Sequence, residues 1–129
     1  MKKPFVAIVD DDSSFAAYLR TFLSLRGYEA RCYTRGDELL ASIKQNETPD
    51  VILLDVMMPG MDGWEVARVI KNHPDFGDTR VVMLTARSGF ADKQEGLRSG
   101  ADDYIVKPIR LDELAARVEK NLEARTSAS

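Results

Sequence analysis

The sequence has little of the two residue types that build disulfide frameworks and zinc sites. Its 129 residues include one cysteine, Cys32, and one histidine, His73. One cysteine cannot form an internal disulfide, which is typical of proteins of the reducing cytoplasm. We interpret Cys32, in an alternating stretch, as a small core residue, and His73, without a second soft ligand nearby, as a surface residue. The composition excludes a disulfide-stapled domain, argues against a zinc centre and predicts a cytoplasmic protein.

Surplus positive charge and long apolar runs are also missing. The 21 Asp and Glu residues outnumber the 18 Lys and Arg residues, which gives a net charge of -3. Holding a nucleic acid backbone requires clustered positive charge, so we expect no direct nucleic acid binding by this domain. No apolar run approaches the about 20 residues that cross a membrane, and the first residues lack the apolar segment of a signal peptide. We therefore expect no membrane contact.

The chain does contain a regular alternation of short apolar runs and segments with helical periodicity. The runs predicted as strands are 5–9, 28–33, 51–55, 81–84 and 104–106. The predicted helices cover about 15–23, 39–43, 64–70, 90–99 and 111–122. Such alternation requires right-handed crossovers and produces a parallel sheet with helices on both faces. The sequence therefore predicts a doubly wound α/β domain over residues 1–124, with a disordered tail or the start of a linker at 125–129.

The chain is organised around residues 51–60, where an apolar run ends in Asp55 and Pro59-Gly60 follows. The Val, Ile and Leu content of the run is typical of a strand buried on both faces. Pro-Gly breaks the strand and starts a loop. Open α/β sheets bind ligands at the carboxyl ends of their strands. Taken alone, Asp55 is also compatible with a turn-capping role, so its interpretation depends on the other strand ends.

The other predicted strands also end in polar residues. In chain order, the strand ends carry Asp10, Asp11, Asp12, Asp55, Thr85 and Lys107. Because parallel strands end at the same edge, we expect these side chains to meet there. Clustered carboxylates repel one another, and Mg²⁺ relieves this because it takes oxygen ligands and needs few protein carboxylates beside phosphate oxygens. The three consecutive aspartates are also compatible with a helix cap, but a cap needs only one of them.

The lysine and the hydroxyl at this edge are suited to phosphoryl chemistry. The Lys107 ammonium can reach Asp55 and act as a point charge for a phosphoryl oxygen, with an exposed surface lysine as the alternative. Thr85 offers a hydroxyl donor at the neighbouring strand end. A nucleophilic carboxylate, a metal ion, a lysine and a hydroxyl together predict a phosphoryl site.

These residues occur in an order that resembles the receiver domain of two-component response regulators, of the chemotaxis-regulator type, over about residues 5–122. The matching segments are Val9-Asp10-Asp11-Asp12, Leu54-Asp55-Val56-Met57-Met58-Pro59-Gly60-Met61-Asp62-Gly63, Leu84-Thr85-Ala86, Gly100-Ala101-Asp102-Asp103-Tyr104 and Lys107-Pro108. The resemblance implies a flavodoxin-like fold with strand order 2-1-3-4-5. It also implies a phosphorylation-controlled switch in a phosphorelay, whose only reactions are self-phosphorylation and self-dephosphorylation.

The resemblance implies roles for the acidic residues. Asp55 would be the phosphoacceptor, which takes a phosphoryl group from a sensor histidine kinase or a phosphotransfer protein. Asp11 would bind Mg²⁺ directly and Asp10 through water. Asp55 itself and the backbone carbonyl of Met57 would complete the protein's share of the metal ligands.

The resemblance also implies how the signal is read. Lys107 would bond Asp55 and then the phosphoryl group, and its peptide bond to Pro108 would be cis. Thr85 and Tyr104 would form the switch. In it, the hydroxyl moves to the phosphoryl oxygen and the aromatic ring rotates inward behind it.

An output face would be formed by the fourth helix, the fifth strand and the fifth helix. The positions that resemble the dimer contacts of receivers attached to winged-helix DNA-binding domains are Lys93, Leu97, Asp103, Glu113, Ala115 and Arg117. A possible homodimer would use this face twice. The alternative is a solvated charged face, because exposed ion pairs contribute little individually.

A Mg²⁺-dependent phosphatase of the haloacid-dehalogenase type also works through an aspartyl-phosphate, and is the main alternative function. That class needs a second Asp two residues after the nucleophile as acid and base, and this chain has Met57 there. A flavodoxin-like cofactor binder would need a phosphate-cradling loop after the first strand. The aspartates at 10–12 would repel phosphate there in the absence of a metal ion.

Overall fold

The computed structural model describes residues 3–45, 47–56, 63–76, 78–85 and 100–128. Within these ranges the strands are β1 (Phe5–Val9), β2 (Glu29–Tyr33), β3 (Val51–Asp55), β4 (Arg80–Thr85) and β5 (Asp103–Val106). The helices are α1 (Ser13–Leu25), α2 (Gly36–Gln45), α3 (Gly63–Asn72) and α5 (Leu111–Ala128). The helix predicted at 90–99 lies outside the described residues.

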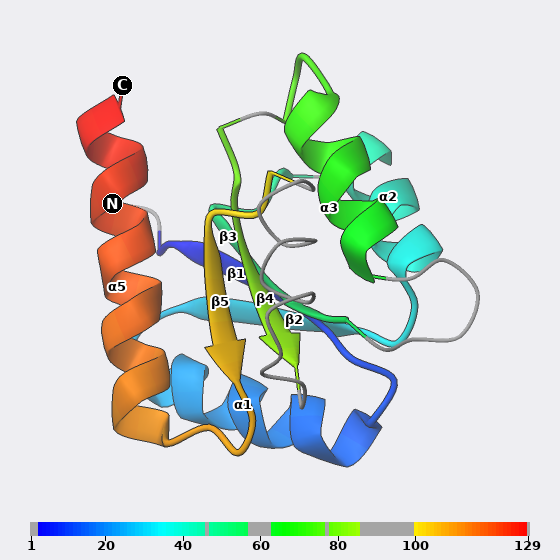
Figure 1. Ribbon diagram of the computed structural model, residues 1–129. Helices are drawn as coiled ribbons and strands as arrows, with labels where there is room; N and C mark the ends of the chain where they lie inside the picture. Colours follow the sequence, from blue (N-terminus) through cyan, green and yellow to red (C-terminus); the bar gives the residue numbers. More distant parts are fainter. Residues whose placement is uncertain (1–2, 46, 57–62, 77, 86–99, 129) are drawn as a thin grey trace.

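The strands form one parallel sheet in the order β2-β1-β3-β4-β5 (Figure 1), which confirms the doubly wound fold and the expected strand order. Every residue of β1 and β3 is buried, as the unbroken apolar runs predicted. Residues of β2 are only half-buried because this strand lies at the edge of the sheet. The central position of β3 places Asp55, its last residue, in the middle of the carboxyl edge.

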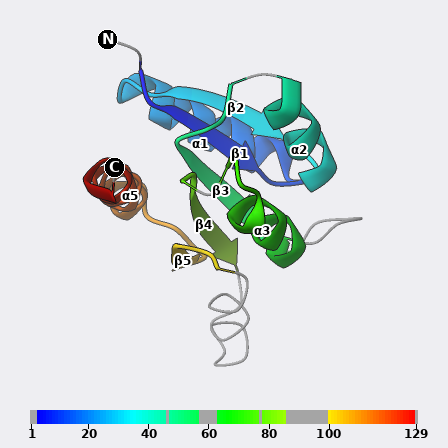
Figure 2. The same cartoon turned by 90° about the horizontal axis from the view of Figure 1, so that it is seen from above.

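Helices cover both faces of the sheet (Figure 2) because alternate residues of each strand point to opposite sides. One core cluster joins Ala7, Val9, Ile52 and Leu54 to apolar residues of α2 and α3. The other joins Val6, Ile8, Val51 and Leu53 to apolar residues of α1 and α5. A residue of β1 or β3 therefore has its face fixed by sequence parity.

The two ends of α1 are set by Asp12 and Gly27. Asp12 is the N-cap, and its carboxylate accepts the Phe15 amide at 3.1 Å. This contact satisfies one of the unpaired amides of the first turn. Gly27, just past the helix, has a φ of 95°, a backbone conformation that residues other than glycine rarely adopt. The helix therefore begins directly beside the acidic strand end.

Helix α5 differs from the prediction at its carboxyl end. We expected a disordered tail or the start of a linker at 125–129, but the helix continues to Ala128. Arg125 forms an ion pair with Asp50, and Asp50 also accepts the Phe5 amide at 2.8 Å, so tertiary contacts hold the last turns. Although α5 is the longest described helix, no helix in the described ranges is long and apolar enough to cross a membrane.

Cys32 and His73 lie in local packing arrangements within the described residues. The Cys32 thiol is half-buried on β2, 3.3 Å from the carbonyl oxygen of Ala16, and burial raises its pKa. The His73 ring stacks on Phe76 with a centroid distance of 4.0 Å, and its Nδ1 accepts the Asp75 amide. His73 therefore organises the turn after α3 and is less exposed than the sequence suggested.

Candidate functional site

The carboxyl edge of the sheet brings together the polar residues that end β1, β3 and β4. Because β3 lies between its two neighbours, Asp55 is flanked by Asp10 on one side and Thr85 on the other. Asp10 and Thr85 are each 1% exposed and Asp55 is 7% exposed. Directly after Asp55, the Val56 amide donates to the carbonyl oxygen of Leu84 at 3.0 Å. The backbone that carries the Asp55 carboxylate is therefore tied into the sheet.

Three carboxylates form an acidic cluster at this edge. One oxygen from each of Asp10, Asp11 and Asp55 lies within 4.8 Å of the others. Asp12 does not join them, because its side chain caps α1. Hard divalent cations take such oxygen donors, and three carboxylates so close together favour binding one. The donor set therefore fits Mg²⁺.

Lys107 is the cation that reaches this acidic cluster in the described part of the chain. Its Nζ donates to Asp10 Oδ2 at 3.1 Å and lies 3.8 Å from Asp55 Oδ1. The expected bond to Asp55 is thus an ion pair, and the shorter contact is to Asp10. The Lys107 amide donates to the Thr85 carbonyl oxygen at 2.7 Å, and the bond to Pro108 is cis, as the resemblance implied. The Lys107 ammonium therefore forms ion pairs with two carboxylates at the ends of different strands.

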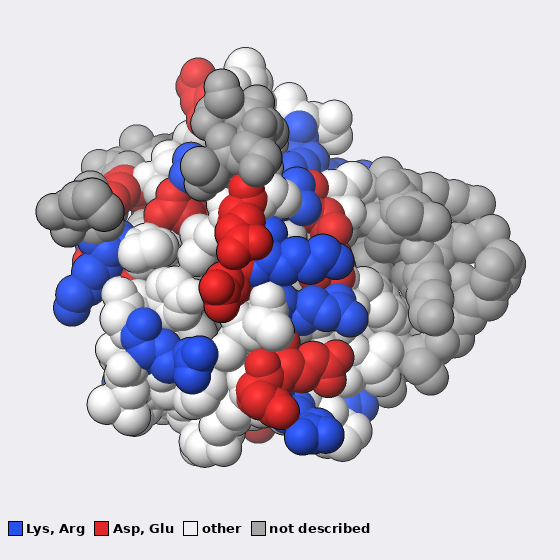
Figure 3. Space-filling model, turned by 90° about the vertical axis from the view of Figure 1, so that its left-hand side faces the viewer, with Lys and Arg blue, Asp and Glu red and all other residues white. Residues whose placement is uncertain are grey.

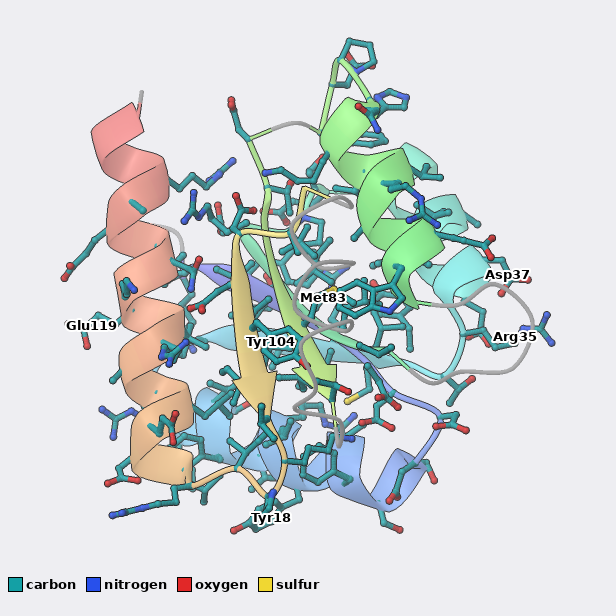
Figure 4. All side chains as sticks on the ribbon, in the orientation of Figure 1. Tyr18, Arg35, Asp37, Met83, Tyr104 and Glu119 are labelled. Carbon is teal, nitrogen blue, oxygen red and sulfur yellow. The ribbon has the colours of Figure 1, made fainter. Side chains whose placement is uncertain are left out.

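Tyr104 lies on β5 with its side chain packed against the core cluster of α2 and α3. It is paired in register with Met83 of β4 (Figure 4). Its ring stacks on Trp64, the second residue of α3, with 6.4 Å between centroids and 7° between planes. The sequence placed Trp64 only at the start of the helix predicted at 64–70. Its contact with Tyr104 joins α3 to the residue expected to act as a switch.

Gly63 brings the start of α3 against the strand end that carries Asp55. A Cβ at residue 63 would lie 2.3 Å from the carbonyl oxygen of Asp55 and 2.9 Å from the Cα of Val56. The Gly63 amide also donates to the Val56 carbonyl oxygen at 3.1 Å. The close approach requires a residue without a side chain, whereas sequence analysis assigned Gly63 no role beyond the motif.

The charged residues of β5 and α5 pair within the chain. Arg117 contacts Asp103 at 2.6 Å and Glu113 at 3.9 Å. The second Asp103 oxygen accepts the amide of Asn121, which is 1% exposed. Acidic and basic side chains alternate over this side of the molecule (Figure 3). Ala115, one of the expected dimer contacts, is only 4% exposed. Pairing between two copies would therefore have to exchange ion pairs that the single chain already makes.

Some expected site residues lie outside the described residues. Met57 falls in 57–62, and Lys93 and Leu97 fall in 86–99. One contact near the site was missed by the sequence reasoning. Phe15, assigned only to the apolar face of a helix, has the Lys107 ammonium 4.7 Å from its ring centroid. Its helical spacing with Leu19 gave no signal for that contact.

A family model described as the response regulator receiver domain matches residues 6–119. The chain therefore belongs to the response regulator receiver family, whose members are phosphoacceptor switches of two-component signal transduction. It is a signalling domain rather than a catalytic enzyme. Receiver domains typically use Mg²⁺ at an acidic pocket, and the carboxylate cluster at the sheet edge agrees with this.

Two curated relatives are transcriptional regulators. The phosphate regulon transcriptional regulatory protein PhoB of Rhizobium meliloti (strain 1021) is 40% identical over 120 residues, which are 92% of this chain and 52% of that protein. The probable transcriptional regulator ycf27 of Porphyridium aerugineum is 40% identical over 129 residues, which are 100% of this chain and 52% of that protein. The chain thus spans about half the length of the curated relatives it matches.

Solved structures agree with the family and the fold. A CheY-like response regulator receiver domain protein from Methanospirillum hungatei JF-1 superposes with a TM-score of 0.90 at 26% identity, over 99% of this chain and 100% of that chain. A putative response regulator from Chloroflexus aurantiacus J-10-fl has a TM-score of 0.89 at 37% identity, over 95% of this chain and 99% of that chain.

Proposed function

We propose that Asp55 is the phosphoacceptor through which this receiver domain is switched. One observation carries the proposal: the Asp55 carboxylate, 7% exposed at the end of the central strand, lies beside two further carboxylates and 3.8 Å from the Lys107 ammonium. A nucleophile, a set of metal ligands and a fixed positive charge then surround one point at which a phosphoryl group can bind.

The phosphoryl donor is a sensor histidine kinase or a phosphotransfer protein, met in the cytoplasm. One Asp55 oxygen attacks the phosphorus of a phosphohistidine; the new P–O bond forms as the P–N bond breaks, and the imidazole leaves. Asp10, Asp11, Asp55 and the backbone carbonyl of Met57 would hold Mg²⁺, which when bound neutralises charge on the phosphoryl oxygens. Lys107 faces the same oxygens from the side of β5.

Thr85 and Tyr104 change position in response to the phosphoryl group. The Thr85 hydroxyl, at the strand end next to Asp55, donates to a phosphoryl oxygen, and the Tyr104 ring follows inward. When the Tyr104 ring moves away from Trp64, a stacking contact worth about 0.5–1.5 kcal/mol is lost. Because this is small beside the interactions of a phosphoryl group, binding one can shift the ring between two arrangements.

The face of β5 and α5, together with residues 86–99, passes the state to an output domain or to a second copy of the chain. In the second case the contacts are Lys93, Leu97, Asp103, Glu113, Ala115 and Arg117. Support comes from the alternating charges on this face and from the curated relatives, which are transcriptional regulators about twice as long as this chain. Control of a transcriptional output is therefore the role that we propose.

The haloacid-dehalogenase type of phosphatase is not favoured. That reaction requires an acid and base two residues after the nucleophile, and Met57 at this position carries no ionisable group. An aspartyl-phosphate formed on Asp55 then lacks the group that would drive rapid turnover of an external substrate.

The test is phosphorylation by acetyl phosphate with Mg²⁺, followed by intact mass. The wild-type mass should rise by one phosphoryl group, and Asp55→Asn should show no rise. Asp11→Ala should lose Mg²⁺-dependent labelling, whereas Asp12→Ala, which removes only a helix cap, should keep it. Labelling of the Asp55→Asn variant at the wild-type rate would refute the assignment.

A further inference from the structure

Within the described residues, three groups lie close to the Lys107 ammonium, and one of them is an aromatic ring rather than a carboxylate. Asp10 Oδ2 lies at 3.1 Å and Asp55 Oδ1 at 3.8 Å. The ring centroid of Phe15 lies 4.7 Å from the same Nζ, within the range of a cation–π contact. The Lys107 side chain is 25% exposed, so the ring takes a position that water would otherwise hold.

Phe15 is itself held in place by its own helix. Its amide donates to the Asp12 carboxylate at 3.1 Å in the N-cap of α1. Its ring packs, half-buried, against the core cluster that includes Leu19 and Val6. Six consecutive residues, 10–15, thus supply two carboxylates, a helix cap and an aromatic ring to the same sheet edge.

The Phe15 ring can restrain the Lys107 ammonium without competing for its hydrogen bonds, which a carboxylate cannot do. The face of an aromatic ring is negative and attracts an ammonium without accepting its protons. The hydrogens of Nζ therefore stay available to the oxygens of Asp10 and Asp55 while the ring restricts where Nζ can lie. A lysine side chain has several rotatable bonds, and ordering it has an entropic cost that a fixed ring reduces at the moment of reaction.

We propose that Phe15 is a positioning residue for phosphoryl transfer, which keeps the Lys107 ammonium between Asp10 and Asp55 by a cation–π contact. The proposal rests on the proposed role of Asp55. It concerns the geometry of the lysine alone, so Mg²⁺ binding should be unaffected. At a partly exposed ammonium, loss of such a contact should slow phosphorylation by roughly three- to tenfold.

The sharpest test replaces Phe15 by fluorinated phenylalanines. A 4-fluoro and then a 3,4,5-trifluoro ring keep the shape while withdrawing electrons from the ring face. Phosphorylation by acetyl phosphate should slow in that order, whereas the Mg²⁺ dissociation constant should stay within about twofold. The second readout is NMR of a chain with labelled lysines, in which the ε-methylene protons of Lys107 should carry an upfield ring-current shift that Phe15→Leu removes.

Phe22 provides a matched control. It lies on the same helix, packs against the same core cluster, and has the Arg26 guanidinium 5.6 Å from its ring centroid. Fluorination at Phe22 changes ring electronics and surface chemistry to the same extent, but should leave the rate and the Lys107 signals unchanged. Equal effects at the two positions would mean a general effect on α1 and would overturn the proposal.

The results of these experiments distinguish failure of the positioning role of Phe15 from failure of the proposed role of Asp55. If the wild-type chain is not labelled at Asp55, the proposed function fails and Phe15 has no transfer to assist. If the wild type is labelled and the trifluoro variant at Phe15 matches its rate, only the positioning role is overturned. Thermal unfolding of each variant identifies loss of folding, and Phe15→Tyr, which keeps a ring face, should retain the rate where Phe15→Leu does not.

Discussion

Replacing Gly63 by alanine should disturb phosphorylation more than it disturbs the fold. The added Cβ would lie 2.3 Å from the Asp55 carbonyl oxygen, 2.9 Å from the Val56 Cα and 3.1 Å from the Asp55 carbonyl carbon. All three are backbone atoms, which cannot rotate out of the way. Since ordinary contacts begin at 3.4 Å, the start of α3 and the end of β3 must separate by about 1 Å.

The size of the effect follows from this displacement. Overpacking in a closed site costs roughly 1–3 kcal/mol of unfolding free energy. A displacement of about 1 Å at a reacting group can slow its reaction by roughly a hundredfold. The Asp55 backbone is the part that must give, so we expect Gly63→Ala to be labelled by acetyl phosphate roughly 10- to 100-fold more slowly while remaining folded.

Gly27 is the matched control for this experiment. Its φ of 95° makes alanine unfavourable there, but no atom of the described residues lies within 4 Å of the added Cβ. Gly27→Ala should therefore destabilise the chain by about 1–2 kcal/mol through backbone strain and leave the labelling rate unchanged. Urea unfolding measures the first quantity and intact-mass kinetics the second. A Gly63→Ala variant that is labelled as fast as Gly27→Ala would refute the reasoning.

Two further predictions concern the output face and the thiol. Arg117→Glu should abolish any self-association that beryllofluoride, a phosphoryl mimic, induces in analytical ultracentrifugation. The substitution places a negative charge beside Asp103 and Glu113, with which Arg117 forms ion pairs. Arg110→Glu, which removes an exposed ion pair, should leave the self-association intact. Equal loss of self-association in both variants would show only a dependence on net charge. Because burial raises the pKa of Cys32, less thiolate is present at pH 8 than in a free cysteine, and iodoacetamide should react slowly until urea is added; equal rates with and without urea would contradict this.

Local sequence pattern was sufficient for most of the architecture. Unbroken apolar runs such as 51–54 predicted strands buried on both faces, and these strands are buried as expected. Asp12 and Gly27 set helix ends through interactions within a few residues. Strand order came from the resemblance, because periodicity does not specify which strands are neighbours. The prediction placed the end of α5 too early, because the helix end is held by the Arg125–Asp50 ion pair, which joins residues far apart in the chain and leaves no local pattern.

By itself, the sequence determined that Asp10, Asp55, Thr85 and Lys107 end parallel strands and so meet at one edge of a sheet. Only the tertiary structure decided which atoms at that edge make contact: Lys107 lies closer to Asp10 than to Asp55, Phe15 covers its ammonium, and Arg117 pairs within its own chain. The physical reason is one of range. Backbone pattern is set by neighbours within a turn or a strand, whereas a side-chain contact depends on rotamers and on competing partners brought together only when the whole chain has packed.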